Sequence, residues 1–244
     1  MQKLHLTPLY MKAKEAIIDM IQKGRFPENR LPPEEELAEK LGISRATIRE
    51  ALMILAREGV VSKKHGVGNF AHPSALENRM RIDLISDIAR LLKASGYEVA
   101  VEHRNFREGE LAPAIAEKLR LAPGETPLYL FDRLYLADGR PAVFITIRIP
   151  RIHVVNDIRN LPAGPTIVDV LKACCNAEPS HSILTFQPLS ADAPLAEIFE
   201  LPEDHPLISW EELFFDLYDR RLCYNTIVFH PRIVQLSMLR KWGR

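Results

Sequence analysis

Two arginines lie one helical turn apart in the stretch SRATIREAL, residues 44–52. Ser44 is a natural N-cap, so Arg45 and Arg49 would stand near a helix N-terminus, where the macrodipole favours acids over cations. We therefore expect their compensating negative charge to lie outside the chain. A guanidinium can bind phosphate oxygens or the O6/N7 edge of guanine, and Thr47 could meet a phosphate or a thymine methyl group.

A short basic hairpin follows this helix. Residues 60–64 and 67–71 have the pattern of two strands around a turn that contains glycine. Glycines let a loop approach a backbone closely, so this turn could enter a minor groove. The candidate DNA-binding residues are therefore Ser44, Arg45, Thr47 and Arg49 of the helix, with Lys64, His65, Gly66 and Gly68 of this hairpin.

Three helices are expected to position these groups. TPLYMKAKEAIIDMIQKG and LPPEEELAEKLG precede SRATIREAL, and each shows apolar residues at helical spacing. The link from Gly42 to Ser44 has the length of a helix-turn-helix connection. With the hairpin, residues 1–71 are predicted to form a winged helix-turn-helix.

The same segment resembles the winged-helix domain of GntR-type bacterial transcription regulators, above all in LPPEEELAEKLGISRATIREAL and HGVGNF. The resemblance implies that Arg45, Thr47, Arg49 and Gly66 contact operator DNA, in half-sites with GT and AC steps. Many members have arginine where this chain has Glu35, which implies an altered contact at that position.

Residues 72–79 have linker composition, and residues 80–244 mix strands and helices. Residues 81–96 are predicted to form one amphipathic helix. A helix–strand–turn–strand pattern that starts near Ala112 recurs from Asp192. This duplication predicts an α+β domain with one antiparallel sheet and pseudo-two-fold symmetry.

Alternation along the first hairpin predicts a ligand site. Tyr129, Phe131, Arg133 and Tyr135 share one face of their strand, because successive side chains point to opposite faces. We expect Phe144, Thr146 and Arg148 of the return strand to share that face and form a pocket for a polar or anionic ligand. The candidate effector-binding residues are Arg133, Tyr135, Arg148, Thr166, His181, Tyr224 and Thr226. The alternative is a solvent-exposed or helix-covered face without a ligand.

EKLRLAPGETPLYLFDRLYLADGRPA, TIVDVL and AEIFELPEDHPLISWEELFFD resemble the UTRA domain of the HutC branch, whose sheet is similar to chorismate lyase. The resemblance implies an effector-binding and dimerisation domain. Relatives that sense sugar phosphates commonly carry a basic residue where this chain has Tyr135 and an acid where it has Ile145. A carboxylate, an aromatic or a nucleoside-like ligand therefore fits this chain better than a phosphosugar.

Composition bounds the remaining functions. The net charge is zero and no apolar run is long enough to span a membrane. The N-terminus lacks the apolar region of a secretory signal. Three cysteines show neither a disulfide framework nor metal-ligand spacing. We expect a cytoplasmic protein with no cofactor and no metal.

Together these features predict a ligand-responsive transcription factor, a repressor that binds a near-palindromic operator as a homodimer. Two alternatives stay open: a DNA-binding regulator or architectural protein without a ligand, and a C-terminal chorismate lyase-like enzyme. The enzyme is disfavoured, because neither His103 nor His181 has a catalytic partner evident in the sequence. We expect no enzyme activity.

Overall fold

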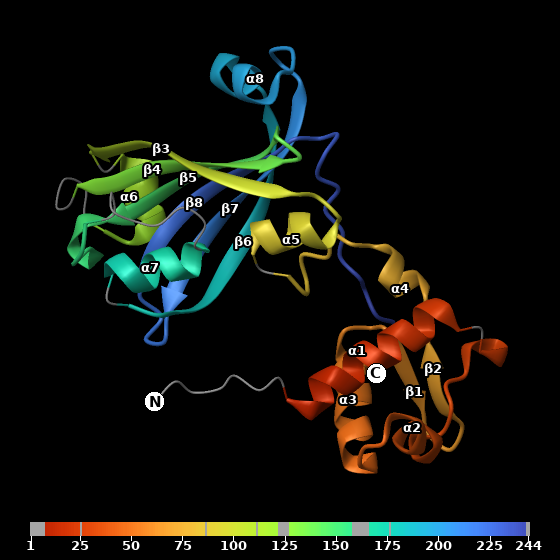
Figure 1. Cartoon of the computed structure of the whole chain (residues 1–244). Helices are drawn as coiled ribbons and strands as arrows, with labels where there is room; N and C mark the ends of the chain where they lie inside the picture. Colours follow the sequence, from red (N-terminus) through yellow and green to blue (C-terminus); the bar gives the residue numbers. More distant parts are fainter. Residues whose placement is uncertain are drawn as a thin grey trace. The chain divides into compact units, whose positions relative to one another are not determined.

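The computed structural model describes residues 8–24, 26–85, 87–110, 112–121, 127–157, 166–175 and 177–242. Its contacts divide the chain into two compact units (Figure 1). The winged-helix unit runs to Leu84 and includes the chain from Ser237 onward, whereas the sheet unit spans Ile85–Leu236. Residues 80–84 and 237–242, which the sequence assigned to the second domain, thus contact the first.

The winged-helix unit contains the predicted three helices and hairpin, so this part of the fold prediction is confirmed. A core of Ile17, Leu37, Ile48 and Leu55 joins the three helices, and each of these side chains is fully buried. Gly42 has φ +64°, a left-handed conformation suited to glycine, and turns the chain between the second and third helices. The elements are α1 (Leu9–Lys23), η1 (Pro27–Asn29), α2 (Glu34–Leu41), α3 (Arg45–Arg57), β1 (Val61–Lys64) and β2 (Gly68–Ala71).

The predicted linker folds onto this unit. Residues Ser74–Glu77 form the short helix α4, and Ala75 is buried in the winged-helix core. The His72 amide donates to the Val60 carbonyl at 2.8 Å. Small apolar side chains next to a proline therefore pack here, although the composition resembles that of a free linker.

The helix predicted over residues 81–96 is shorter in the structure. α5 spans Ile88–Ala94, because the Asp87 carboxylate caps it by accepting the Arg90 amide at 2.8 Å. Residues 82–84 form a turn in the winged-helix unit instead. The apolar periodicity located the helix but did not fix its start.

The sheet unit is built on a six-stranded antiparallel sheet in the order β3-β4-β5-β8-β7-β6. The helix–hairpin repeat appears as α6 (Pro113–Leu119) before β4 and β5, and α8 (Ala193–Phe199) before β7 and β8. Both helices end in a left-handed residue, Arg120 (φ 53°) and Glu200 (φ 55°). The two halves meet where β5 pairs with β8, as pseudo-two-fold symmetry predicts. The strands are β3 (Val99–Gly109), β4 (Leu128–Ala137), β5 (Arg140–Pro150), β6 (Pro179–Ser190), β7 (Pro206–Asp216) and β8 (Arg221–Phe229).

Helices cover both faces of this sheet. α6 packs on Leu128 and Tyr224, and α8 packs on Leu207 and Val228, so these side chains define the α6/α8 face. α7 (Ile167–Cys175) lies across the opposite face, which we call the α7 face (Figure 1). Within the described residues, no helix is long and apolar enough to cross a bilayer.

Candidate nucleic-acid interface and effector site

The start of α3 is fixed by its own cap. The Ser44 hydroxyl accepts the Thr47 amide at 3.1 Å and lies 2.8 Å from the Thr47 hydroxyl. Arg45 and Arg49 project from the first turns with about half or more of each side chain exposed, 55% and 62%. The two cations are therefore accessible to a ligand, while Ser44 and Thr47 bind each other.

Both arginines have acidic partners within the chain, which corrects the expectation that their compensating charge lies outside it. Arg49 donates through Nη2 and Nε to Glu34 Oε2 at 3.0 and 3.2 Å. Arg45 Nη1 donates to Glu35 Oε1 at 3.0 Å. The first turn of α2 thus supplies carboxylates that compensate these two cations, which the α3 macrodipole does not favour near its N-terminus.

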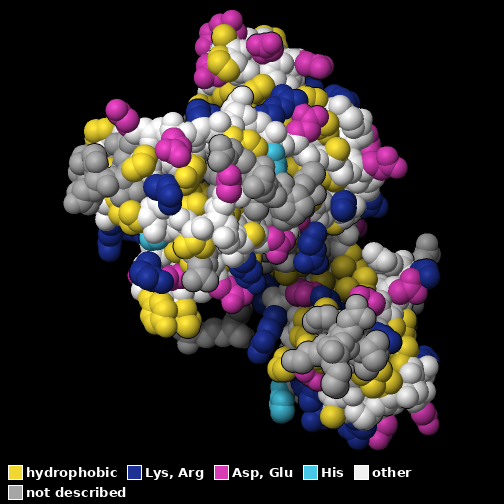
Figure 2. Space-filling view, turned by 60° about the vertical axis from the view of Figure 1, so that its left-hand side comes forward, with side chains coloured by type: hydrophobic (Ala, Val, Ile, Leu, Met, Phe, Trp, Pro, Cys, Tyr) yellow, Lys and Arg dark blue, Asp and Glu magenta, His cyan; other side chains and the backbone are white. Residues whose placement is uncertain are grey.

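These ion pairs are exchangeable. Exposed pairs contribute little to stability, so a phosphate or a base edge can replace the carboxylates at small cost. Glu34 differs from Glu35, because its side chain is only 16% exposed and also lies 3.6 Å from Lys63 Nζ. Figure 2 shows basic and acidic side chains intermixed on the winged-helix unit.

The hairpin presents the predicted wing residues. Gly66 and Gly68 have φ values of +70° and +137°, backbone conformations that residues other than glycine rarely adopt. Lys64 and His65 are exposed beside them. Arg30, which the sequence analysis missed, donates to the Val67 carbonyl, and its Nε would lie 3.2 Å from a Cβ at Gly68.

A hollow of about 350 Å³ lies between the wing and the starts of α2 and α3. Its cationic rim suits a phosphate-bearing strand. No sequence spacing identifies Arg30, because it lies before α2 and contacts the wing only once the chain is folded. The lining residues are Arg30, Leu31, Pro32, Pro33, Glu34, Glu35, Arg45, Lys63, Lys64, Gly66, Val67, Gly68 and Asn69.

On the sheet, Arg133 and Tyr135 lie together on the α7 face. Arg133 is 1% exposed, and its guanidinium carbon lies 5.1 Å from the centre of the Tyr135 ring. Burial raises the pKa of the Tyr135 hydroxyl to about 12. Burial and the Arg133 charge lower the pKa of His103, which is paired with Arg133 across β3 and β4.

Arg148, Tyr224 and Thr226 lie on the α6/α8 face instead. Arg148 Nη1 donates to the Thr226 hydroxyl at 3.0 Å, and its guanidinium carbon lies 5.4 Å from the centre of the Tyr224 ring. Burial and a hydrogen bond to Glu211 raise the pKa of the Tyr224 hydroxyl. The predicted single pocket is therefore wrong, because its two arginines lie on opposite faces of the sheet.

A β-bulge at Ala142 explains this error. Directly paired residues of antiparallel strands share a face, and the structure pairs Arg133 with Ile145 and Leu130 with Arg148. The register shifts by one residue between Tyr135 and Leu136, at the point where Ala142 is left unpaired. A one-residue shift moves every later side chain of the return strand to the other face.

The two remaining candidates are engaged locally. Thr166 begins α7 as a capping box: its hydroxyl donates to Asp169 Oδ2 at 2.8 Å and accepts the Asp169 amide at 3.1 Å. His181 is exposed on β6, where its ring stacks on Phe215 with centres 4.8 Å apart. The structure thus brings Arg133 and Tyr135 together, groups Arg148 with Tyr224 and Thr226, and leaves His181 at the sheet edge.

A second hollow, of about 370 Å³, was not predicted. It is lined by Tyr129, which shares the Arg133 face, and by Arg107 and Arg151. The Arg151 guanidinium carbon lies 5.4 Å from the centre of the Tyr129 ring. The lining also includes Glu108 and Asp157, so the hollow combines both charges with aromatic rings and suits a small polar or aromatic ligand.

Comparisons with known proteins agree with this architecture. Residues 9–70 match the gntR family of bacterial regulatory proteins, and residues 94–234 match the UTRA domain, which alone covers more than half of the chain. The HTH-type transcriptional regulator YurK of Bacillus subtilis is 24% identical over 95% of both chains. The histidine utilization repressor of Pseudomonas putida is 38% identical over 37% of this chain and 36% of its own length.

A solved structure shares the whole fold. The possible transcriptional regulator YydK from Bacillus subtilis superposes with a TM-score of 0.73 at 18% identity, covering 96% of this chain and all of that one. These relatives are transcription regulators and not enzymes. The chain therefore belongs to the GntR family of transcription regulators, in the HutC-like branch that carries a UTRA ligand-binding domain.

Proposed function

We propose that this regulator is a cytoplasmic repressor that binds a near-palindromic operator as a homodimer and responds to a small polar or anionic metabolite. The observation that carries the ligand response is Arg133, a guanidinium with 1% exposure inside the sheet unit. Arg133 lies beside the Tyr135 ring, and a guanidinium next to an aromatic ring can bind an anionic or aromatic group of a ligand. Repression is supported by the similarity of this chain to the histidine utilization repressor of Pseudomonas putida.

The dimer is supported by an apolar strand at one edge of the sheet, as far as the structure describes the chain. β6 ends the sheet on one side, and Ile183, Leu184 and Phe186 of this strand are 56%, 39% and 49% exposed. β3 at the other edge carries charged side chains and a register shift, features that discourage edge pairing. Isologous pairing through β6 would give the two-fold symmetry that a palindromic operator requires.

The test starts from the ligand that the protein retains. Mass spectrometry of denatured, freshly purified protein identifies a co-purified small molecule, and adding it back should change operator affinity. Arg133→Met should keep DNA binding and lose this response. Arg148→Met is the matched control, since Arg148 lies on the opposite sheet face and should leave the response intact.

Two results would contradict this proposal, at different points. In one, Arg133→Met would respond to the ligand as the wild type does, which would exclude Arg133 as the residue that carries the response. In the other, no metabolite from a broad library of carboxylates and aromatic acids would stabilise the protein against heat, which would favour a regulator without a ligand. If Arg133→Met unfolds at a much lower temperature than Arg148→Met, Arg133 is structural.

A further inference from the structure

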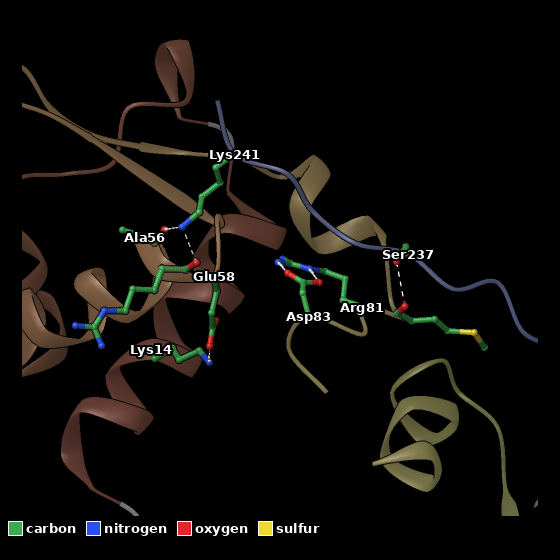
Figure 3. A network of polar contacts seen from close by, with 9 residues as sticks. Lys14, Ala56, Glu58, Arg81, Asp83, Ser237 and Lys241 are labelled. Atoms are coloured by element: carbon green, nitrogen blue, oxygen red, sulfur yellow. Dashed lines mark hydrogen bonds and ion pairs between the residues drawn. The ribbon is translucent and has the colours of Figure 1, made fainter. Parts of the chain in front are cut away.

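The segment 237–242 belongs to the winged-helix unit, although the chain reaches it directly from the sheet unit. Figure 3 shows Lys241 of this segment at the end of α3, and Ser237 close to the residues around Arg81. The chain therefore passes between the units twice, near residue 85 and near residue 236.

Near these two passages, residues 80–82 and Ser237 are hydrogen-bonded to each other. The Ser237 amide and hydroxyl donate to the Met80 carbonyl at 3.0 and 3.1 Å, and the Ile82 amide donates to the Ser237 carbonyl at 3.1 Å. The side chain of Arg81, only 5% exposed, binds Asp83 and lowers the pKa of that carboxyl group. The two segments at these passages are thus joined to each other within the winged-helix unit.

Lys241 binds the end of α3. Its Nζ donates to the Arg57 carbonyl at 2.8 Å and to the Ala56 carbonyl at 3.2 Å. A helix cannot satisfy the carbonyls of its last turn by itself, and a cation is favoured there by the macrodipole. Lys241 therefore stabilises the C-terminal end of the helix whose N-terminal end carries Arg45 and Arg49.

Leu239 packs against the turn that follows α3. A Cβ added to Gly59 would lie 2.6 Å from Leu239 Cδ2, and Gly59 has φ +75°. On another side, Lys14 of α1 binds Glu58 at 2.5 Å. The end of α3 is thus held by α1 and by the C-terminal segment.

The same segment is anchored closely on its other side. Ile233 and Val234 are buried in the sheet unit, and the His230 amide donates to the Ala142 carbonyl at 2.9 Å. Only residues 235 and 236 separate Val234 from Ser237. Because this connection is so short, a displacement of the chain after β8 would be transmitted to residues 237–242, which contact the end of α3.

We infer that residues 237–242 position the recognition helix α3, and that they are a second connection through which the sheet unit acts on that helix. Leu239 and Lys241 are the positioning residues. The coupling part of this inference rests on the proposed ligand response, whereas the positioning part does not.

The positioning role is tested with the full-length protein and a DNA duplex that the wild type selects from a random library. Lys241→Met should weaken binding by about 2- to 5-fold, the scale of a helix C-terminal cation, and Leu239→Ala should weaken it further. Both variants should speed amide hydrogen exchange in the last turn of α3. Lys241→Arg should restore affinity and protection.

Arg240→Met is the matched control, because Arg240 is exposed, stacks on Trp242 and carries the same charge. It should leave binding and exchange unchanged. If it weakens binding as much as Lys241→Met does, the segment acts through general attraction to phosphates, which overturns the inference. Unchanged affinity and exchange in both Lys241→Met and Leu239→Ala would overturn it as well.

The second connection is tested by inserting a flexible Gly-Ser segment between Gln235 and Leu236, which keeps every contact of residues 237–242. Coupling is reciprocal, so the selected duplex serves as the probe. In the wild type, DNA binding should change amide exchange in α5 and β8. The insertion should keep the DNA affinity and abolish this change, while the same segment added at the C-terminal end of the chain should have no effect.

The outcomes separate the two proposals. No exchange change in the wild-type sheet unit would contradict the ligand-responsive function itself. A wild-type change that survives the insertion would leave that function standing and overturn the second connection.

Discussion

Glu34 and Glu35 place the two recognition arginines in different environments. Glu34 is mostly buried and binds both Arg49 and Lys63, whereas Glu35 is 77% exposed and binds Arg45. Glu34 therefore orients Arg49, and Glu35 adds an exposed negative charge where DNA phosphates would approach. The sequence revealed the arginines through their spacing. It did not reveal their partners, which lie on another helix.

Arg49→Ala should weaken operator binding by about 1–3 kcal/mol if Arg49 reads a base edge. The loss should be largest on the preferred sequence and should relax specificity at one base pair, as measured by fluorescence anisotropy with single-base variants of the operator. Binding equal to that of the wild type would refute the assignment of α3 as the recognition helix.

Glu35→Ala should tighten DNA binding, because it removes a negative charge and releases Arg45 to a phosphate. One added phosphate contact should steepen the slope of log affinity against log salt by about 0.9. Salt titrations of binding provide the measurement. Glu36→Ala is the control, since Glu36 binds Lys40 on its own helix. A slope that stays at the wild-type value would show that Arg45 gains no phosphate.

At the scale of elements, local signals identified most of the fold. Apolar periodicity, the Ser44 cap and the left-handed Gly42 located the winged helix, and the internal repeat predicted the sheet. The relation between β4 and β5 was not predictable, because the bulge at Ala142 depends on packing within the finished sheet. The candidate ligand residues were therefore assigned to the right strands and, for Arg148, to the wrong face.

Thr166→Ala should destabilise the sheet unit by about 1 kcal/mol, the typical cost of losing an N-cap. Thr166→Ser should be nearly neutral, since serine keeps the hydroxyl that caps α7. Thermal unfolding measures both. Equal stability of wild type and Thr166→Ala would show that the cap is unimportant.

The cap also gives a pH dependence. Hydrogen bonds from Thr166 lower the pKa of Asp169 in the folded protein. Their stabilisation is present above the unfolded pKa and is lost as the pH falls through the lower, folded pKa. The stability difference between wild type and Thr166→Ala should therefore shrink in acid.

At the scale of the whole molecule, sequence position misled domain assignment. The C-terminal segment joins the winged-helix unit through contacts with residues far away in the chain, such as Gly59 and Met80. Composition and periodicity describe neighbours along the sequence, so neither could reveal these contacts.

Dimerisation through β6 can be tested by introducing a charged side chain on this strand. Ile183→Lys should shift the protein from dimer to monomer in sedimentation velocity, because it places a cation on the exposed strand edge. Affinity for a palindromic duplex should fall while affinity for a single half-site stays constant. Leu217→Lys, at a position that is 81% exposed and outside the strands, is the control. A dimer that persists in Ile183→Lys would assign the interface to another surface.

The double passage of the chain also orders events during synthesis. Translation runs from the N-terminus, so α1 to α4 emerge early, and Leu239 and Lys241 are added only after the entire sheet unit has been made. A nascent chain can form the three helices on the ribosome, but the end of α3 is held by α1 and lacks the contacts of Leu239 and Lys241 until residues 237–242 are made. Full DNA-binding competence is therefore expected only in chains whose ligand-binding domain is already complete.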